Sequence, residues 1–173
     1  MDLDGVTAIG KINQVCLAGG VIEKLNQQTG VHQKLIFGDK FGSVHLMDIS
    51  RKLILDKKAL PKYEGRRILN IATACLEWID TRLIYCAIVA RGSPIVSIVC
   101  FKHNENKLYH LYSLNTCPEL ENPDQLELNE GQTYLMLPSE VKMSVDGEFL
   151  TVTSFDGSVK LIQMPPVFDP MNF

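Results

Sequence analysis

The sequence predicts an all-β protein assembled from repeated units of short antiparallel strands. Two observations carry this prediction. Short runs rich in β-branched and aromatic residues recur along the chain between glycine-containing turns, and one such segment near the C-terminus has a near copy upstream. The composition, with 46% hydrophobic and 21% charged residues, is typical of a globular chain that buries a core.

The clearest unit is Val141–Met164, VKMSVDGEFLTVTSFDGSVKLIQM, which predicts three strands joined by two tight turns. Phe149–Thr153 and Val159–Gln163 are rich in bulky and β-branched side chains, as strands are. Glycine tolerates the positive φ that a tight hairpin turn often needs. We assign the two turns to Asp146, Gly147, Asp156 and Gly157.

The near copy is Leu35–Ile49, LIFGDKFGSVHLMDI. Its pentapeptide GSVHL begins at a predicted turn residue, Gly42, and matches GSVKL at Gly157–Leu161 in four of five positions. Lys52–Leu55 is expected to be the outer strand of this unit. Pro61 ends it, because proline cannot donate a hydrogen bond to a ladder.

A middle unit lies between these two. Ile68–Trp78 is predicted as its inner strand, with Trp78 packed in the core. Two apolar strands, Leu83–Ala90 and Ile95–Phe101, follow and are joined by a turn at Gly92, and Lys107–Leu114 is a fourth strand. Units of several strands that recur at roughly 40 to 60 residues are typical of β-propeller blades.

The motifs of the last unit resemble those of a WD-repeat blade. The matching positions are Ser144, Asp146, Gly147, Asp156 and Gly157. The pattern departs at the strand ends, where the family has Trp-Asp and this chain has Met47-Asp48, Val99-Cys100 and Ile162-Gln163, and no Gly-His pair precedes any unit. The resemblance therefore implies a divergent WD-like propeller, whose usual buried hydrogen-bond tetrad is not present in recognisable form.

The resemblance implies four-stranded antiparallel blades over residues 35–164. A closed ring needs at least about four blades of some 40 residues, so three units predict a partial β-propeller, a segment of a larger ring. Residues 1–34 are interpreted as a lead-in or partial blade, in which Ile9–Leu17 is a candidate strand. Residues 115–131 hold five carboxylates and no lysine or arginine, which predicts an acidic insertion between blades. Residues 165–173 are a Pro-rich tail.

Net charge, cysteine content and hydropathy indicate which partners and which cellular compartment to expect. A net charge of −3 and a pI near 5.8 argue against binding to nucleic acid by bulk electrostatics. Five cysteines without a CxxC pair favour a reducing compartment. No apolar run approaches the roughly 20 residues of a membrane helix, and the acidic start is unlike a signal peptide. We therefore expect a cytoplasmic protein without membrane insertion. The resemblance to WD-like propellers further implies that the protein belongs to a cytoskeletal or ciliary assembly.

No motif for chemistry stands out. Gly5–Ile12 has the GxxxxGK spacing of a phosphate-binding loop, but Ile12 stands where Ser or Thr would bind Mg²⁺. Residues that zinc accepts occur in a spacing that fits no common zinc finger, and we expect buried thiols and an edge histidine instead: Cys100, His103, His110 and Cys117. No nucleophile elbow or catalytic triad is recognisable. We predict no catalytic residue, no metal site and no cofactor.

The strongest candidate for a partner-binding surface is cationic. Seven basic residues fall within a short stretch that contains only two acidic ones, and on an outer strand and its loops they would form a ridge for acidic proteins: Arg51, Lys52, Lys57, Lys58, Lys62, Arg66 and Arg67. The alternative is that these cations only protect an outer edge strand from pairing with other chains. The acidic insertion, similarly, is either a docking segment or a solubilising loop.

Two functions remain in view. The resemblance implies a non-enzymatic scaffold for protein–protein interaction, because WD-like propellers serve mainly in assemblies, and this is an inference from fold alone. The alternative is a ligand-binding or enzymatic propeller domain with an unrecognised pocket.

Overall fold

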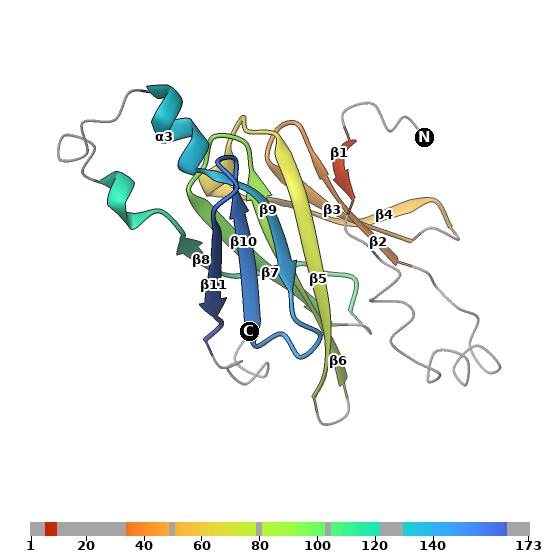
Figure 1. Cartoon of the computed structure of the whole chain (residues 1–173). Helices are drawn as coiled ribbons and strands as arrows, with labels where there is room; N and C mark the ends of the chain where they lie inside the picture. The colour runs from red at the N-terminus through yellow and green to blue at the C-terminus, as the bar shows by residue number, and fades with distance from the viewer. Residues whose placement is uncertain are drawn as a thin grey trace.

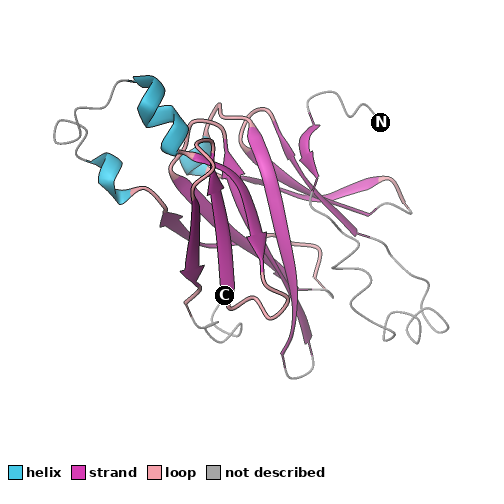
Figure 2. Cartoon of the chain, viewed as in Figure 1, coloured by secondary structure: helices cyan, strands magenta, loops and turns pink. Residues whose placement is uncertain are grey.

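The computed structural model describes residues 6–9, 34–48, 51–78, 81–102, 105–121 and 130–165. Strands dominate these residues, and the helical turns are short (Figure 2). Three antiparallel sheets follow one another in the chain, which confirms the predicted all-β class. The first sheet has the order β1-β2-β3-β4, the second β5-β6-β7-β8, and the third, with three strands, β11-β10-β9.

The strands of the first sheet are β1 (Val6–Ile9), β2 (Lys34–Asp39), β3 (Ser43–Asp48) and β4 (Leu53–Ala59). The second sheet consists of β5 (Ile68–Trp78), β6 (Thr81–Ala90), β7 (Ile95–Lys102) and β8 (Tyr109–Asn115). The third consists of β9 (Pro138–Met143), β10 (Phe149–Ser154) and β11 (Val159–Gln163). Short helical segments connect the sheets: η1 (Pro61–Tyr63), η2 (Pro118–Glu121) and α3 (Glu130–Met136).

The predicted strands of the middle and last units are present with small shifts at their ends. Near the N-terminus, the β-prone run VTAI forms β1 and pairs with β2 from Ile9↔Phe37 back to Val6↔Asp39. Residues 10–33 lie outside the described part, and with them all of the candidate strand Ile9–Leu17 except Ile9. Within the acidic insertion 115–131, η2 is described, and α3 begins at Glu130.

The second sheet lies between the other two (Figure 1). Successive side chains of a strand point to opposite faces. In β6, Ile84, Cys86 and Ile88 therefore pack toward the first sheet, while Tyr85 and Val89 pack toward the third. Both faces of β6 and β7 are buried, and these two central strands are almost continuously apolar.

The inner strand of the second sheet, β5, neighbours the inner strands of the other two sheets, β1 and β9. Each sheet then extends outward from its inner strand, in the order in which the strands occur in the chain. This is the arrangement of successive propeller blades around an axis. We call the sheets blade one, blade two and blade three below.

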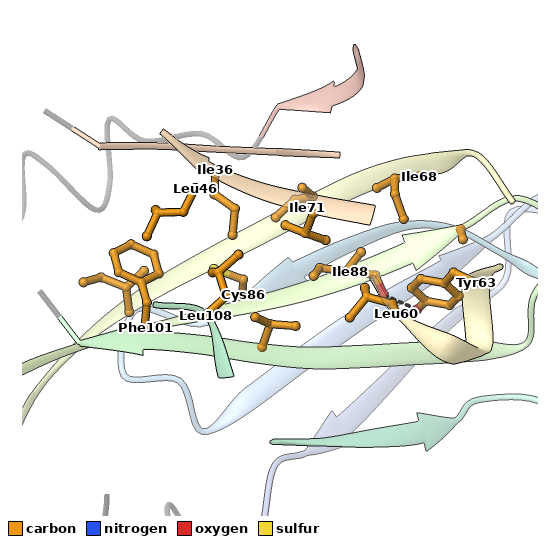
Figure 3. Packing of buried hydrophobic residues seen from close by; sticks show 14 residues of the cluster. Ile36, Leu46, Leu60, Tyr63, Ile68, Ile71, Cys86, Ile88, Phe101 and Leu108 are labelled. Carbon is orange, nitrogen blue, oxygen red and sulfur yellow. Dashed lines mark hydrogen bonds between the residues drawn. The ribbon is translucent and has the colours of Figure 1, made fainter. Parts of the chain in front are cut away.

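Tyr63 joins blades one and two (Figure 3). Its side chain is fully buried, and its hydroxyl lies 2.5 Å from the carbonyl oxygen of Ile88 and 2.8 Å from that of Ile95. The same hydroxyl accepts a 2.9 Å hydrogen bond from the backbone N–H of Ser97. Burial raises the pKa of Tyr63 to about 12, so the phenol is neutral. One side chain from the blade one connection thus satisfies backbone groups of two strands of blade two.

Candidate partner-binding surface

The predicted cationic ridge is not one continuous surface. β3 and β4 are antiparallel, so the turn that carries Arg51 and Lys52 lies at the end of blade one opposite to η1 and the loop after it. Lys57 and Lys58 are neighbours on β4, and their side chains therefore point to opposite faces. Lys62, Arg66 and Arg67 share one end of the blade with η1, and Lys57 is paired there with Asp39.

This end, which we call the η1 end, is built from three segments that are distant in the sequence. The β2–β3 turn meets the loop after η1, where the N–H of Gly65 donates to the carbonyl of Phe41 over 3.2 Å. That loop also meets the β6–β7 turn, because the N–H of Arg91 donates to the carbonyl of Arg67 over 2.8 Å and the Arg66 guanidinium donates to the carbonyl of Gly92. Backbone hydrogen bonds therefore hold the turns of two blades side by side.

Asp39 fixes the β2–β3 turn. One carboxylate oxygen accepts hydrogen bonds from the N–H groups of Phe41 (2.8 Å) and Ser43 (2.9 Å), and the other lies 2.9 Å from Nε2 of His45. Burial raises the pKa of this carboxyl, but the hydrogen bond from His45 and those from the backbone outweigh it and hold the pKa below its ordinary value. The His45 ring also stacks on Phe37. Sequence reasoning missed this network because it sought the family's usual pattern.

Gly42 makes the same turn possible. Its φ is +85°, and a Cβ built on it would lie 2.0 Å from the carbonyl oxygen of Tyr63. Only glycine fits this close approach between two backbones. The other predicted turn glycines, Gly92, Gly147 and Gly157, also have positive φ. In the β9–β10 turn, Asp146 accepts a hydrogen bond from Ser144, and in the β10–β11 turn Asp156 accepts one from the N–H of Ser158.

The η1 end of blades one and two exposes five cations and one aromatic ring. Phe41 is 63% exposed at the tip of its turn, with the Lys40 ammonium 5.1 Å from its ring centroid. Within the described residues, none of the five basic side chains lies in an ion pair, and Glu64 is the one exposed acid in the same three segments. The five are Lys40, Lys62, Arg66, Arg67 and Arg91. Lys40 and Arg91 were missed because they lie far from the others in the sequence.

The corresponding end of blade three has a different character. Lys160 of β11 contacts the carbonyl oxygen of Thr116 over 2.6 Å and Glu119 over 2.9 Å. Burial lowers the pKa of Lys160, but Glu119 outweighs it, so the ammonium stays charged. The buried thiol of Cys117 is close by and donates to the carbonyl of Met136 over 3.2 Å. The acidic connection is thus tied to blade three, where Glu119 forms an ion pair with Lys160 of β11.

The residue types that zinc accepts do not converge. Cys100 pairs with Tyr109 and Val99 pairs with His110, so Cys100 and His110 lie on opposite faces of blade two and cannot share one ion. Cys117 is at the η1 end, and His103 lies outside the described residues. Among the described residues there is no group of three His, Cys, Asp or Glu side chains that could hold a metal. Of the Gly5–Ile12 motif only residues 6–9 are described, as part of strand β1, and the side chain of Trp78 falls outside the described part.

One face of blade three is open. Leu150 and Val152 of β10 pack toward blade two, whereas Phe149 on the other face is 38% exposed. On β11, Val159 and Leu161 are 62% and 70% exposed on that same open face.

None of the helices in the described residues is long and apolar enough to cross a lipid bilayer.

No protein-family model matches the sequence, and no curated protein matches it significantly. Among solved structures, the chain is similar to that of U3-55K, with a TM-score of 0.52 and 15% identity, over 92% of this chain and 42% of that one. It also matches a chain of the mitotic checkpoint complex (TM-score 0.46, 11% identity, 76% and 33% covered). A third match is the C-terminal WD40 domain of Sif2 (TM-score 0.45, 12% identity, 76% and 31% covered).

This chain therefore spans between 31% and 42% of the length of these three solved chains. At such low identity the likeness speaks to the fold alone. The three successive antiparallel sheets, with neighbouring inner strands, agree with the likeness to U3-55K. The chain has the fold of a β-propeller segment.

Proposed function

We propose that this chain is a non-enzymatic scaffold that binds other proteins in the cytoplasm. One observation carries the proposal: the η1 end presents five cations free of ion pairs within the described residues, on turns that hydrogen bonds hold in place. Fixed turns lose little conformational entropy when a partner binds, which favours affinity. The buried free thiols of Cys86, Cys100 and Cys117 are compatible with a reducing compartment.

A scaffold in a cytoskeletal or ciliary assembly stays a prediction from the family resemblance. The enzymatic alternative has less support, because the groups whose pKa values burial raises most are core residues. Burial raises the pKa of Tyr63 and that of Cys100, to about 12 and about 11. Both groups are held neutral among apolar neighbours, where they neither activate a nucleophile nor transfer a proton near neutral pH.

The test is capture followed by reconstitution. The immobilised chain is crosslinked in a cytoplasmic extract, the captured proteins are identified, and each is purified and mixed with the chain alone. We expect at least one protein to form a stoichiometric complex by size-exclusion chromatography, with neither component chemically altered in its mass spectrum. A reproducible chemical change in a small molecule or protein on incubation, without a stable complex, would reject the scaffold in favour of an enzyme.

A further inference from the structure

We infer that the η1 end of blades one and two is a docking site for an acidic peptide segment that carries one large apolar side chain. This inference rests on the proposed scaffold function and assigns a place and a chemistry to it. The apolar side chain packs on Phe41, and the carboxylates around it meet the cations of the β2–β3 turn, the η1 loop and the β6–β7 turn.

The first argument is charge. Lys40, Lys62, Arg66, Arg67 and Arg91 are all exposed, and Glu64 is the single exposed acid within the three segments that carry them. The whole chain has a net charge of −3, so this concentration of positive charge opposes the overall balance. Arginine is well suited to such a site because its planar guanidinium binds carboxylates through two parallel hydrogen bonds.

The second argument is the aromatic ring. Phe41 is 63% exposed although its neighbours Phe37 and Tyr63 are buried. It stands at a turn that Asp39, Gly42 and the N–H of Gly65 hold in one conformation. A rigid exposed aromatic residue surrounded by polar groups is a typical anchor point of a protein interface. A partner that binds only through charged groups would leave the Phe41 ring exposed to water.

The third argument separates a peptide from a nucleic acid. A long polyanion that crossed the η1 end would continue from blades one and two toward blade three, where Glu119 and Asp156 are found and Lys160 is already paired. Like charge there disfavours an extended strand of phosphates. A short acidic peptide fits within the cationic part, and its apolar side chain gives Phe41 a partner.

The test uses fluorescence anisotropy with synthetic peptides. The probe is a fluorescein-labelled acidic peptide of about ten residues with a central phenylalanine, the length that an extended chain needs to cross two blades. Comparison probes carry serine at the centre, lysine in place of the acids, or consist of oligo(dT). We expect the acidic phenylalanine peptide to bind saturably and more tightly than any comparison probe. Its binding should weaken as salt rises from roughly 50 to 300 mM because exposed charges are screened.

Variants locate the site. Arg67→Glu with Arg91→Glu should weaken binding by about tenfold or more, since each reversal replaces attraction by repulsion. The matched control, Lys52→Glu with Lys107→Glu, makes the same change in net charge at the opposite end and should stay within about twofold of the parent. Phe41→Ser should weaken binding of the phenylalanine peptide to the level of the serine peptide, and Phe41→Leu should restore part of it. Thermal melts followed by circular dichroism verify that each variant is folded.

Three outcomes overturn the inference: no binding of the acidic phenylalanine peptide by the parent chain, equal loss in the two charge-reversed pairs, or binding of oligo(dT) as strong as that of the peptide. The scaffold proposal is separable from it. A reconstituted protein partner that still binds the Arg67→Glu, Arg91→Glu variant would reject the η1 end as the docking site and leave the scaffold function standing.

Discussion

Blades two and three contain the same kind of strand but differ in how many of their faces are covered. Every side chain of β6 from Leu83 to Ala90 is buried, whereas β10 alternates between buried and half-exposed residues and β11 exposes Val159 and Leu161. Blade two has a neighbour on each side, and blade three has one covered face. The pattern of a strand thus reports how many neighbours its sheet has: a continuous apolar run indicates two and alternation indicates one.

The largest expected effect comes from truncating the core of blade two. Ile88 is fully buried between blades one and two. Ile88→Ala should lower the free energy of unfolding by about 3 kcal/mol, through lost burial and the cavity left behind. Leu161→Ala, on the open face of blade three, should lower it by less than about 0.5 kcal/mol. Urea unfolding of both variants measures the difference, and similar losses would show that the open face of β11 is covered in solution.

A smaller contrast is expected between two glycines with nearly equal φ. Gly42 and Gly157 have φ values of +85° and +84°, but a Cβ on Gly42 would collide with the Tyr63 backbone while one on Gly157 would meet no atom within 4 Å. Gly157→Ala should cost about 1 kcal/mol for its positive φ alone. Gly42→Ala should cost roughly 2 kcal/mol more, because two backbones must separate. Thermal melts of both variants measure the two costs. Equal costs would mean that the positive φ alone, and not the contact of Gly42 with the Tyr63 backbone, makes alanine unfavourable.

Tyr63→Phe should have the next largest effect. Removing the hydroxyl leaves the buried N–H of Ser97 without this acceptor, at a cost of about 1 to 2 kcal/mol near neutral pH. The pKa of Tyr63 is raised to about 12 in the folded chain, against about 10 when unfolded, so its stabilising contribution is complete below pH 10. That contribution is lost as the pH rises from 10 toward 12, because the unfolded chain then releases the proton first.

Denaturant titrations at several alkaline pH values measure this dependence. The parent should lose stability more steeply than Tyr63→Phe above pH 10. Parallel curves would mean that other buried phenols, such as Tyr85, account for the alkaline loss.

The smallest change in stability is expected for Leu161→Lys. The side chain is 70% exposed, so the free energy of unfolding should change by no more than about 0.5 kcal/mol. The charge should nevertheless reduce self-association, because it interrupts an exposed apolar face. Sedimentation velocity over a range of protein concentrations checks this. A large loss of stability together with unchanged association would indicate that β11 is packed against another part of the chain.

The strands and turns were largely predictable because they depend on local signals. Ile68–Trp78 is a strand over the predicted range, and the three strands of Val141–Met164 are present. α3 was missed, because its sequence EGQTYLM contains no helical repeat long enough to stand out. β1 was not predicted at Val6–Ile9, because a strand of four residues gives almost no periodic signal.

The candidate site was less predictable because it depends on contacts between distant segments. The run of seven cations looked like one ridge in the sequence, but antiparallel pairing of β3 with β4 separates Arg51 from Lys62 by the length of a strand. Arg91 joins the site because hydrogen bonds from Arg91 to Arg67 and from Arg66 to Gly92 hold the β6–β7 turn against the loop after η1. Sequence distance also hid the role of Tyr63, whose hydroxyl partners belong to the next blade.

The long reach of Tyr63 has a consequence for synthesis of the chain. The Tyr63 hydroxyl accepts a hydrogen bond from Ser97, which lies 34 residues later in the sequence. During translation the tyrosine therefore leaves the ribosome well before the strands that hydrogen-bond with it. When only blade one has been synthesised, the Tyr63 hydroxyl has none of its hydrogen-bond partners. Tyr63 becomes buried once β6 and β7 have formed. A nascent chain that stops within blade two would expose this residue, and we expect blades one and two to become protease-resistant together, in one step of elongation.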